Sequence, residues 1–151
     1  MLFLQTREGY RQWSTGKAVA FVGEEHEGHS FTIGVACRIA GMDFRALLDT
    51  GAAWSVVDGE IAEAAGSELS DPLEDVVISS RFGTSKGALH RLQLTLPAEE
   101  GRDLSVGATV AVLKNWRGPT VLGFRGFLER IQIALQPAID ADVAYIHFAG
   151  L

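Results

Sequence analysis

The sequence is poor in cysteine and has no long apolar run. Its one cysteine, Cys37, cannot form an intrachain disulfide or a zinc site built from several thiolates. We expect Cys37 to pack as a small buried hydrophobic residue. No segment approaches the roughly 20 apolar residues that span a bilayer, and the apolar start Met1–Leu4 meets Arg7 and Glu8 too soon for a signal peptide. We therefore expect a cytoplasmic protein without a membrane partner.

Positive charge is also scarce. Lys and Arg together number 13 against 19 Asp and Glu, which gives a net charge of −6 at pH 7. Because binding of a phosphate backbone needs a basic patch, we expect no nucleic-acid partner. Apolar residues make up 47% and charged residues 21% of the 151 positions, which is the balance of an ordinary globular domain with its own core.

The pattern along the chain changes near residue 30. Residues 1–28 mix aromatic residues with glycines and end in acidic residues. We interpret them as an irregular N-terminal arm that packs on the body or on a partner chain, and residues 29–151 as one domain. Residues 31–41 alternate large apolar with small or polar side chains, as a half-buried strand does. A turn at 41–43 and a returning strand over 43–51 complete a predicted hairpin.

Short strands dominate the rest of the sequence. Residues 58–65 predict one or two helical turns that end at Gly66. Two strands are predicted within 75–97 around a glycine-bearing tip, a further strand over 108–116, and two closing strands over 131–137 and 143–149. A short helix is predicted from Gly126. Closely spaced strands with one or two short helices predict an all-β barrel or sandwich-like domain.

The most informative segment is 46–57, Ala-Leu-Leu-Asp-Thr-Gly-Ala-Ala-Trp-Ser-Val-Val. Asp-Thr-Gly alone is an ordinary turn sequence, because Asp bonds its own backbone and Gly allows φ > 0. Following an apolar pair at the end of a predicted strand, it resembles the active-site signature of retroviral-type (retropepsin-like) aspartic proteases. The resemblance implies that Asp49 is the catalytic carboxylate and that Thr50 bonds across a dimer axis. Gly51 would let the two loops turn and approach closely.

Two further segments follow in the order that this family requires. The hairpin around Phe82, Gly83 and Thr84 is placed like the flap that closes over the substrate, and its glycines give the tip mobility. Val121-Leu122-Gly123, with Gly126 and Phe127 soon after, resembles the second family signature, which packs under the catalytic loop. The resemblance covers about residues 31–148 and implies an all-β, retropepsin-like closed barrel.

The resemblance also implies a function. In such a protein two Asp49 carboxylates share one proton and activate a water that attacks the peptide carbonyl, without a metal or organic cofactor. Because this chain has one Asp-Thr-Gly, the second carboxylate would come from a second copy. The expected partners are that copy, in a homodimer, and an extended peptide or protein substrate. We assign substrate binding to Ala52, Ala53, Phe82, Gly83, Thr84, Val121 and Leu122.

The sequence departs from the viral pattern after Gly123. Viral members usually place an arginine next, whereas here Phe124 follows and Arg125 comes one place later. This is closer to bacterial retropepsin-like proteins, and the dimer contact of that arginine does not carry over. The alternative function is a catalytically idle retropepsin-like module that binds peptides or dimerises. The intact Asp49-Thr50-Gly51 favours the enzyme, because a binding module has no need for a shared carboxylate.

Other candidate sites are weaker. His26 and His29 lie among Glu24, Glu25 and Glu27, a set that is chemically competent for zinc or nickel. No further group of ligands accompanies them, so we interpret this segment as a solvated acidic loop. The small basic cluster of Arg81, Lys86 and Arg91 is interpreted as a solvated hairpin face.

Overall fold

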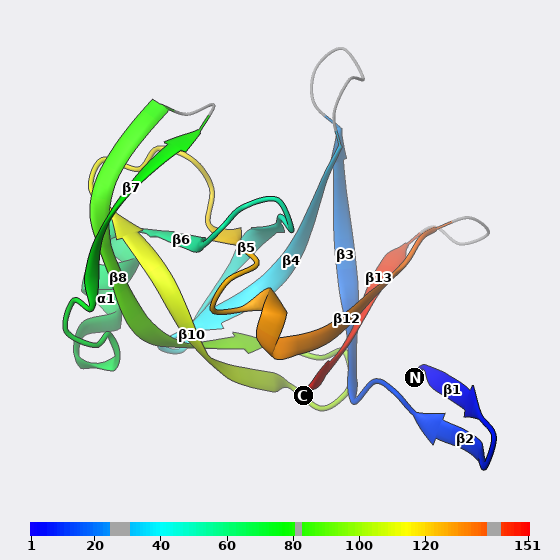
Figure 1. Ribbon diagram of the computed structural model, residues 1–151. Coiled ribbons are helices and arrows are strands. Elements are labelled where there is room, and N and C mark those ends of the chain that lie inside the picture. Colours follow the sequence, from blue (N-terminus) through cyan, green and yellow to red (C-terminus); the bar gives the residue numbers. More distant parts are fainter. Residues whose placement is uncertain (25–30, 81–82, 139–142) are drawn as a thin grey trace.

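The computed structural model describes residues 1–24, 31–80, 83–138 and 143–151. Over these ranges the chain is mostly β-structure, arranged as one large sheet and one separate hairpin (Figure 1). Within the same ranges, no helix combines the length and the apolar character needed to cross a membrane.

The large sheet closes on itself. Its elements are β3 Gly16–Glu24, β4 Phe31–Ile39, β5 Met42–Leu48, β6 Ser55–Asp58, β7 Glu74–Ser80, β8 Gly83–Leu96, β9 Glu100–Gly101, β10 Leu104–Leu113, β11 Val121–Leu122, β12 Ile131–Gln136 and β13 Ala144–Gly150. Strands β4, β5, β11, β6, β10 and β8 follow one another in the sheet, and a pairing of β8 with β4 through Arg38 and Thr95 completes a ring. Strands β3, β13 and β12 extend the sheet from β4, and β7 extends it from β8.

The core lies inside this ring because its strands alternate apolar and polar residues. On β4 the side chains of Val35, Cys37 and Ile39 are fully buried, and on β8 the leucines at 92, 94 and 96 are buried between exposed or half-buried neighbours. Phe127 and Phe148 are the largest fully buried side chains. The prediction that Cys37 packs as a buried hydrophobic residue is confirmed.

The helical prediction over 58–65 is also confirmed. Helix α1 runs from Gly59 to Ala65, and the Asp58 carboxylate accepts hydrogen bonds from the backbone N–H groups of Glu60 at 2.8 Å and Ile61 at 3.0 Å. Aspartate is a preferred residue at this capping position because its oxygen satisfies N–H groups that have no partner inside the helix. Gly66 follows α1 and starts the 3₁₀ turn η1, Gly66–Glu68.

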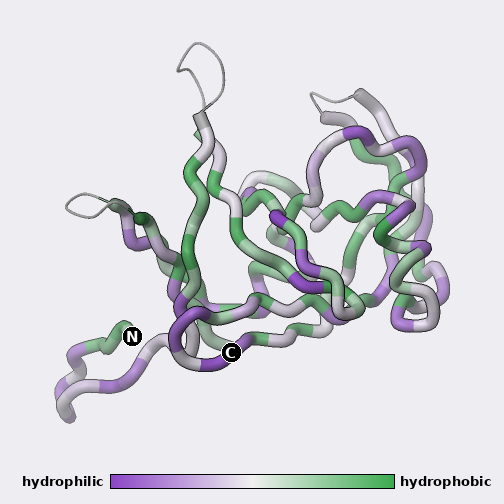
Figure 2. Tube along the Cα trace, turned by 180° about the vertical axis from the view of Figure 1, so that it is seen from behind, coloured by the Kyte–Doolittle hydropathy of each residue, from purple (hydrophilic) through white to green (hydrophobic). Residues whose placement is uncertain are grey.

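The prediction of an irregular segment over residues 1–28 is wrong for the described part. Strands β1 Phe3–Thr6 and β2 Gly9–Gln12 form an exposed hairpin, and β3 pairs with both β4 and β13 inside the large sheet. The hairpin lies apart from the body and carries long hydrophilic stretches (Figure 2). Glycines at 9, 16 and 23 hide the strand pattern in the sequence. The division into an arm over 1–28 and a domain over 29–151 stays a prediction.

Two other elements differ from their predicted bounds. Strand β10 begins at Leu104 and ends at Leu113, instead of covering 108–116, because it pairs with β8 from Leu104 opposite Leu96 to Leu113 opposite Gly87. Asn115, with a φ of 59°, then turns the chain away from the sheet. The short helix predicted from Gly126 is a single 3₁₀ turn, η2 Leu128–Arg130.

One buried histidine in the sheet has an incomplete set of hydrogen bonds. His147 on β13 is 3% exposed, and its Nε2 lies 2.7 Å from Oε1 of Gln136 on β12. Because an amide oxygen only accepts, Nε2 carries the proton. Among the described residues, Nδ1 has no partner. Burial lowers the pKa of His147 from 6.5, and the N-terminal amino group and Lys17 lower it further, against an opposing effect of Glu100.

This environment predicts that stability falls on acidification. Since the pKa of His147 is lower in the folded than in the unfolded chain, the unfolded chain binds more protons below about pH 6.5, and the free energy of unfolding decreases there. We expect the difference in unfolding free energy between wild type and His147→Gln to decline from pH 7 to pH 5, as measured by urea unfolding. Parallel curves for the two proteins over this range would contradict the prediction.

Candidate active site

The Asp49-Thr50-Gly51 loop connects β5 to β6, and its backbone holds the carboxylate in place. Oδ1 of Asp49 accepts hydrogen bonds from the N–H groups of Gly51 at 2.9 Å and Ala52 at 3.2 Å. An aspartate that bonds the backbone two residues ahead is the usual form of an Asx turn. Gly51 does not have a positive φ; an added Cβ there would lie 3.2 Å from Oδ1 of Asp49. Asp49 and Thr50 are both exposed.

Strand β11 lies between β5 and β6 and fixes both sides of the loop. Val121 pairs with Leu47 of β5 in parallel and with Val56 of β6 in antiparallel orientation. The N–H of Leu47 donates to the carbonyl of Thr120 at 2.8 Å, and the N–H of Asp49 donates to the carbonyl of Leu122 at 3.0 Å. The backbone of Asp49 is therefore hydrogen-bonded to the sheet, although its side chain is at the surface.

A buried serine completes this attachment. The hydroxyl of Ser55, which is fully buried, accepts a hydrogen bond from the N–H of Gly123 at 2.9 Å. A Cβ at Gly123 would lie only 2.3 Å from the backbone carbon of Trp54, so only glycine allows this approach. Ser55 belongs to the segment that carries the motif, but no role was predicted for it. The signal that could have identified it is a single hydroxyl residue directly before two apolar β-branched residues.

Residues 124 and 125 continue the contact on the far side of the loop. The N–H groups of Phe124 and Arg125 donate to the carbonyls of Ala52 and Ala53, each at 2.9 Å. Arg125 pairs with Trp54, and its guanidinium lies 6.0 Å from the centre of the Trp54 ring. The arginine that is displaced by one place relative to the viral pattern thus contacts the loop of its own chain.

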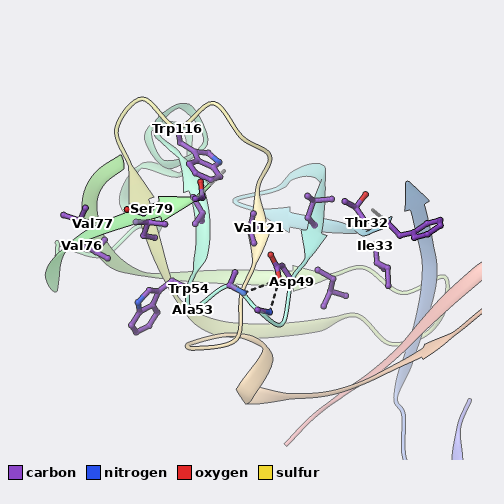
Figure 3. A pocket seen from close by; sticks show the side chains of 18 residues that line it. Thr32, Ile33, Asp49, Ala53, Trp54, Val76, Val77, Ser79, Trp116 and Val121 are labelled. Carbon is purple, nitrogen blue, oxygen red and sulfur yellow. Dashed lines mark hydrogen bonds between the residues drawn. The ribbon is translucent and has the colours of Figure 1, made fainter. Parts of the chain in front are cut away.

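The loop forms the floor of a groove with a volume of about 920 Å³ (Figure 3). One wall comes from β7 and from Trp116, whose indole N–H donates to the carbonyl of Pro119 at 2.8 Å. The opposite rim comes from the start of β4. The lining residues are mostly apolar, and Asp49 is the charged residue among those that the structure describes. They are Phe31, Thr32, Ile33, Leu47, Leu48, Asp49, Gly51, Ala52, Ala53, Trp54, Val56, Val76, Val77, Ile78, Ser79, Ser80, Trp116 and Val121.

Only some of the predicted substrate-binding residues lie at the groove. Ala52, Ala53 and Val121 line the groove. Leu122 is 1% exposed and packs in the core. Gly83 and Thr84 begin β8 at the end of the hairpin and do not line the groove within the described part of the chain. Phe82 lies outside the described residues.

Several groove residues were missed in the sequence. Trp116 follows a strand and precedes Gly118 and Pro119, and an aromatic residue in such a turn is the signal that could have found it. The residues at the start of β4 carry no local signal, since their pattern is that of any half-buried strand. The β4–β5 hairpin, in which Gly34 lies opposite Leu47, brings them beside Asp49.

The described residues contain no group of three or more His, Cys, Asp or Glu side chains placed to hold a metal ion. His26, His29, Glu25 and Glu27 of the acidic segment lie outside the described residues. Of the basic cluster, Arg81 also lies outside them.

Comparison with known proteins bears on the fold. No family model and no curated protein matches the sequence. Among solved structures, the chain is similar to a retropepsin-like aspartic protease from Rickettsia conorii, with a TM-score of 0.54 and 16% identity over 89% of this chain and 98% of that chain. It is also similar to EIAV protease complexed with the inhibitor HBY-793, with a TM-score of 0.44 and 18% identity over 66% of this chain and 88% of that chain. The first likeness shows that the fold is retropepsin-like, which confirms the predicted fold class.

The free energy of unfolding of two variants tests the attachment of the loop through Ser55 and Gly123. Ser55→Ala leaves the buried N–H of Gly123 without a partner, and we expect a loss of about 1–3 kcal/mol in unfolding free energy. Gly123→Ala forces a Cβ against rigid backbone, and we expect a loss of at least about 3 kcal/mol. Both are measured by urea unfolding.

Gly107→Ala on β10 is the matched control, because an added Cβ there meets its nearest neighbour, a flexible glutamine side chain, only at 3.9 Å. We expect it to change the unfolding free energy by no more than about 0.5 kcal/mol. Equal effects of the two glycine substitutions would contradict the assigned role of Gly123.

Proposed function

We propose that this chain is an aspartic endopeptidase whose active form is a two-fold homodimer with one Asp49 from each copy. The observation that carries the proposal is the Asp49 carboxylate, which two backbone N–H groups fix on an exposed loop at the floor of a groove whose lining residues are mostly apolar. The retropepsin-like fold supports it, because the first structural neighbour is described as a retropepsin-like aspartic protease.

The exposure of the loop supports the second copy. A single carboxylate cannot act as both acid and base in one step, and this chain offers one Asp-Thr-Gly. Asp49 and Thr50 are at the surface, where a symmetry-related loop has access to them. Among the described residues the Thr50 hydroxyl makes no hydrogen bond of its own. We assign to it the bond across the axis that the family resemblance implies.

The reaction uses the electrostatics of two close carboxylates. Because two negative charges a few ångströms apart are unfavourable, the pair holds one proton between them. The ionised Asp49 takes a proton from a water, whose oxygen attacks the peptide carbonyl carbon, while the protonated Asp49 donates its proton to the carbonyl oxygen. The C–N bond of the resulting tetrahedral intermediate then breaks as a proton passes to the leaving nitrogen. The two carboxylates and the water supply all of this chemistry.

The groove offers backbone and side-chain contacts to an extended peptide. Strand β7 ends the order of the large sheet, so one of its edges has no strand partner among the described residues. A substrate that adds to this edge gains main-chain hydrogen bonds, with its side chains directed alternately towards the groove. The β7–β8 hairpin would act as the flap. A cytoplasmic location also stays a prediction, to which a lone buried cysteine is suited.

Asp49→Asn tests the proposal. The amide oxygen can still accept from the N–H groups of Gly51 and Ala52, so we expect the variant to fold, but it cannot serve as the base. With a degenerate peptide library between about pH 4 and 7, we expect cleavage by the wild type to fall at least about a thousandfold in the variant. Mass spectrometry of the products measures the rate and the preferred sequence.

Asp71→Asn is the matched control, because Asp71 is an exposed aspartate outside the groove. It should cleave like the wild type. If neither the folded wild type nor the control cleaves any peptide, the endopeptidase proposal is wrong, and the alternative of an idle peptide-binding module replaces it.

A further inference from the structure

His147 lies on the outer face of the sheet, yet it is buried. Its neighbours on β13, Ile146 and Phe148, are 1% and 0% exposed and belong to the core. Because side chains alternate along a strand, His147 points to the opposite face. It is nevertheless only 3% exposed. Other parts of the chain therefore cover the imidazole on that face.

Lys17 and Met1 bring positive charge to this face. Lys17 of β3 lies opposite His147 in the pairing of β13 with β3. Met1 lies at the start of β3: its Sδ is 3.8 Å from Oγ of Ser14, and its Cε is 2.5 Å from the place that a Cβ on Gly101 would take. The amino group of Met1 and the Lys17 ammonium both lower the pKa of His147. A neutral imidazole thus lies in the field of two cations.

One carboxylate opposes these two charges. Glu100 of β9 lies opposite Lys17 and binds its ammonium at 3.3 Å. The Glu100 side chain is 62% exposed, so water screens its effect on His147. Tyr145, two residues before His147 on the same face, has the Lys17 ammonium 4.1 Å from its ring centre. Strand β12 presents an alanine and the amide of Gln136, neither of which is charged.

A proton added to Nδ1 of His147 has no acceptor. Nε2 already donates to Oε1 of Gln136 at 2.7 Å, and among the residues that the structure describes Nδ1 has no partner. An imidazolium would therefore bury an unpaired donor and add a third positive charge beside Lys17 and Met1. Once the ring is protonated, a rearrangement that brings water to Nδ1 becomes more favourable.

Met1 and Leu2 are held less firmly than the strands around His147. Strand β13 forms ladders of six residue pairs with β12 and five with β3. The carbonyl of Leu2 accepts the N–H groups of Trp13 at 2.8 Å and Ser14 at 3.3 Å, and the N–H of Leu2 donates to the Ser14 hydroxyl at 2.9 Å. The β1–β2 hairpin that follows projects away from the body (Figures 1 and 2).

We propose that protonation of His147 releases Met1 and Leu2 from the start of β3, and that His147 is thereby an acid-sensitive latch for the β1–β2 hairpin. Release moves the amino group of Met1 away from the imidazolium and opens the outer face of the sheet to water. The hairpin then loses its attachment to the body, and an isolated two-stranded hairpin is at best marginally stable. Because His147 lies outside the groove, the inference is independent of the proposed endopeptidase.

The direction of the pH effect follows from the two states of the latch. In the closed state, burial and two cations hold the pKa of His147 below 6.5. In the open state the ring is hydrated and returns to its ordinary pKa. The open state therefore binds more protons below about pH 6.5, so acid favours release.

Hydrogen exchange of the full chain, followed residue by residue by NMR, tests the latch. The amides of Trp13 and Ser14 report release because both donate to the carbonyl of Leu2. After correction for the intrinsic exchange rate at each pH, we expect their protection to fall at least about threefold from pH 7 to pH 5. The amide of Thr15 donates to the carbonyl of Phe148 at 2.9 Å, belongs to the body and should keep its protection.

His147→Gln should abolish the fall, because glutamine gains no proton in this range and its amide can still donate to Gln136. His90→Gln is the matched control: Nδ1 of His90 lies 2.8 Å from the carbonyl of Ser70 on another part of the sheet. This variant should show the wild-type fall. Glu100→Gln keeps His147 and removes the opposing carboxylate. It should enlarge the fall, since the closed-state pKa of His147 drops further.

Three results would overturn the inference. One is unchanged protection of Trp13 and Ser14 in the wild type between pH 7 and pH 5. Another is a fall of wild-type size in His147→Gln, or, where that variant does not fold, a fall that Glu100→Gln leaves unchanged. The third is an equal loss of protection at Thr15, which would show a general loosening of β3 instead of release of the first residues.

Discussion

The placement of β11 between β5 and β6 is the constraint on which the candidate site depends. This strand has only two residues, yet it pairs on both sides and accepts the N–H of Asp49 through the carbonyl of Leu122. Beyond it, Gly123 is tied to the buried hydroxyl of Ser55. Because these bonds join backbone groups and one buried side chain, solvent does not compete for them. The carboxylate is exposed, but the hydrogen bonds that hold its loop are buried. A reactive group at the surface can be fixed in advance in this way.

Three exposed features gather around the same loop. The Thr50 hydroxyl, the Asp49 carboxylate and the ring of Phe31 are all exposed within one region of the molecule, next to the groove. The apolar ring of Phe31 gains free energy when it leaves water, whereas covering the carboxylate or the hydroxyl costs free energy unless each gains a partner. Any molecule that covers this region must therefore offer apolar surface to the ring and polar partners to Asp49 and Thr50.

The sequence predicted those parts of the fold that depend on neighbouring residues. The alternation of residues 31–48, the leucines of β8 and the Asp58 cap of α1 are local patterns, and each element formed where it was expected. The Asp-Thr-Gly loop was found for the same reason. The rim formed by the start of β4 follows from the same predicted hairpin, because Gly34 lies opposite Leu47. The role of Ser55 and the pairing of β3 with β13 depend on contacts between distant segments. No local pattern encodes them, and the glycines in β3 weakened the one signal that existed.

The hydrogen bond between Gly123 and Ser55 joins residues 68 positions apart, and this separation has a consequence for the newly made protein. A ribosome adds residues from the amino end, so Asp49 emerges long before β11 exists. Until residues 121–123 have been synthesised, the hydrogen bonds of the loop to β11 and the bond between Gly123 and Ser55 cannot form. Contacts of such long range also form slowly. The loop therefore lacks this support in the growing polypeptide, and a truncated product that stops short of residue 121 would carry Asp49-Thr50-Gly51 without it.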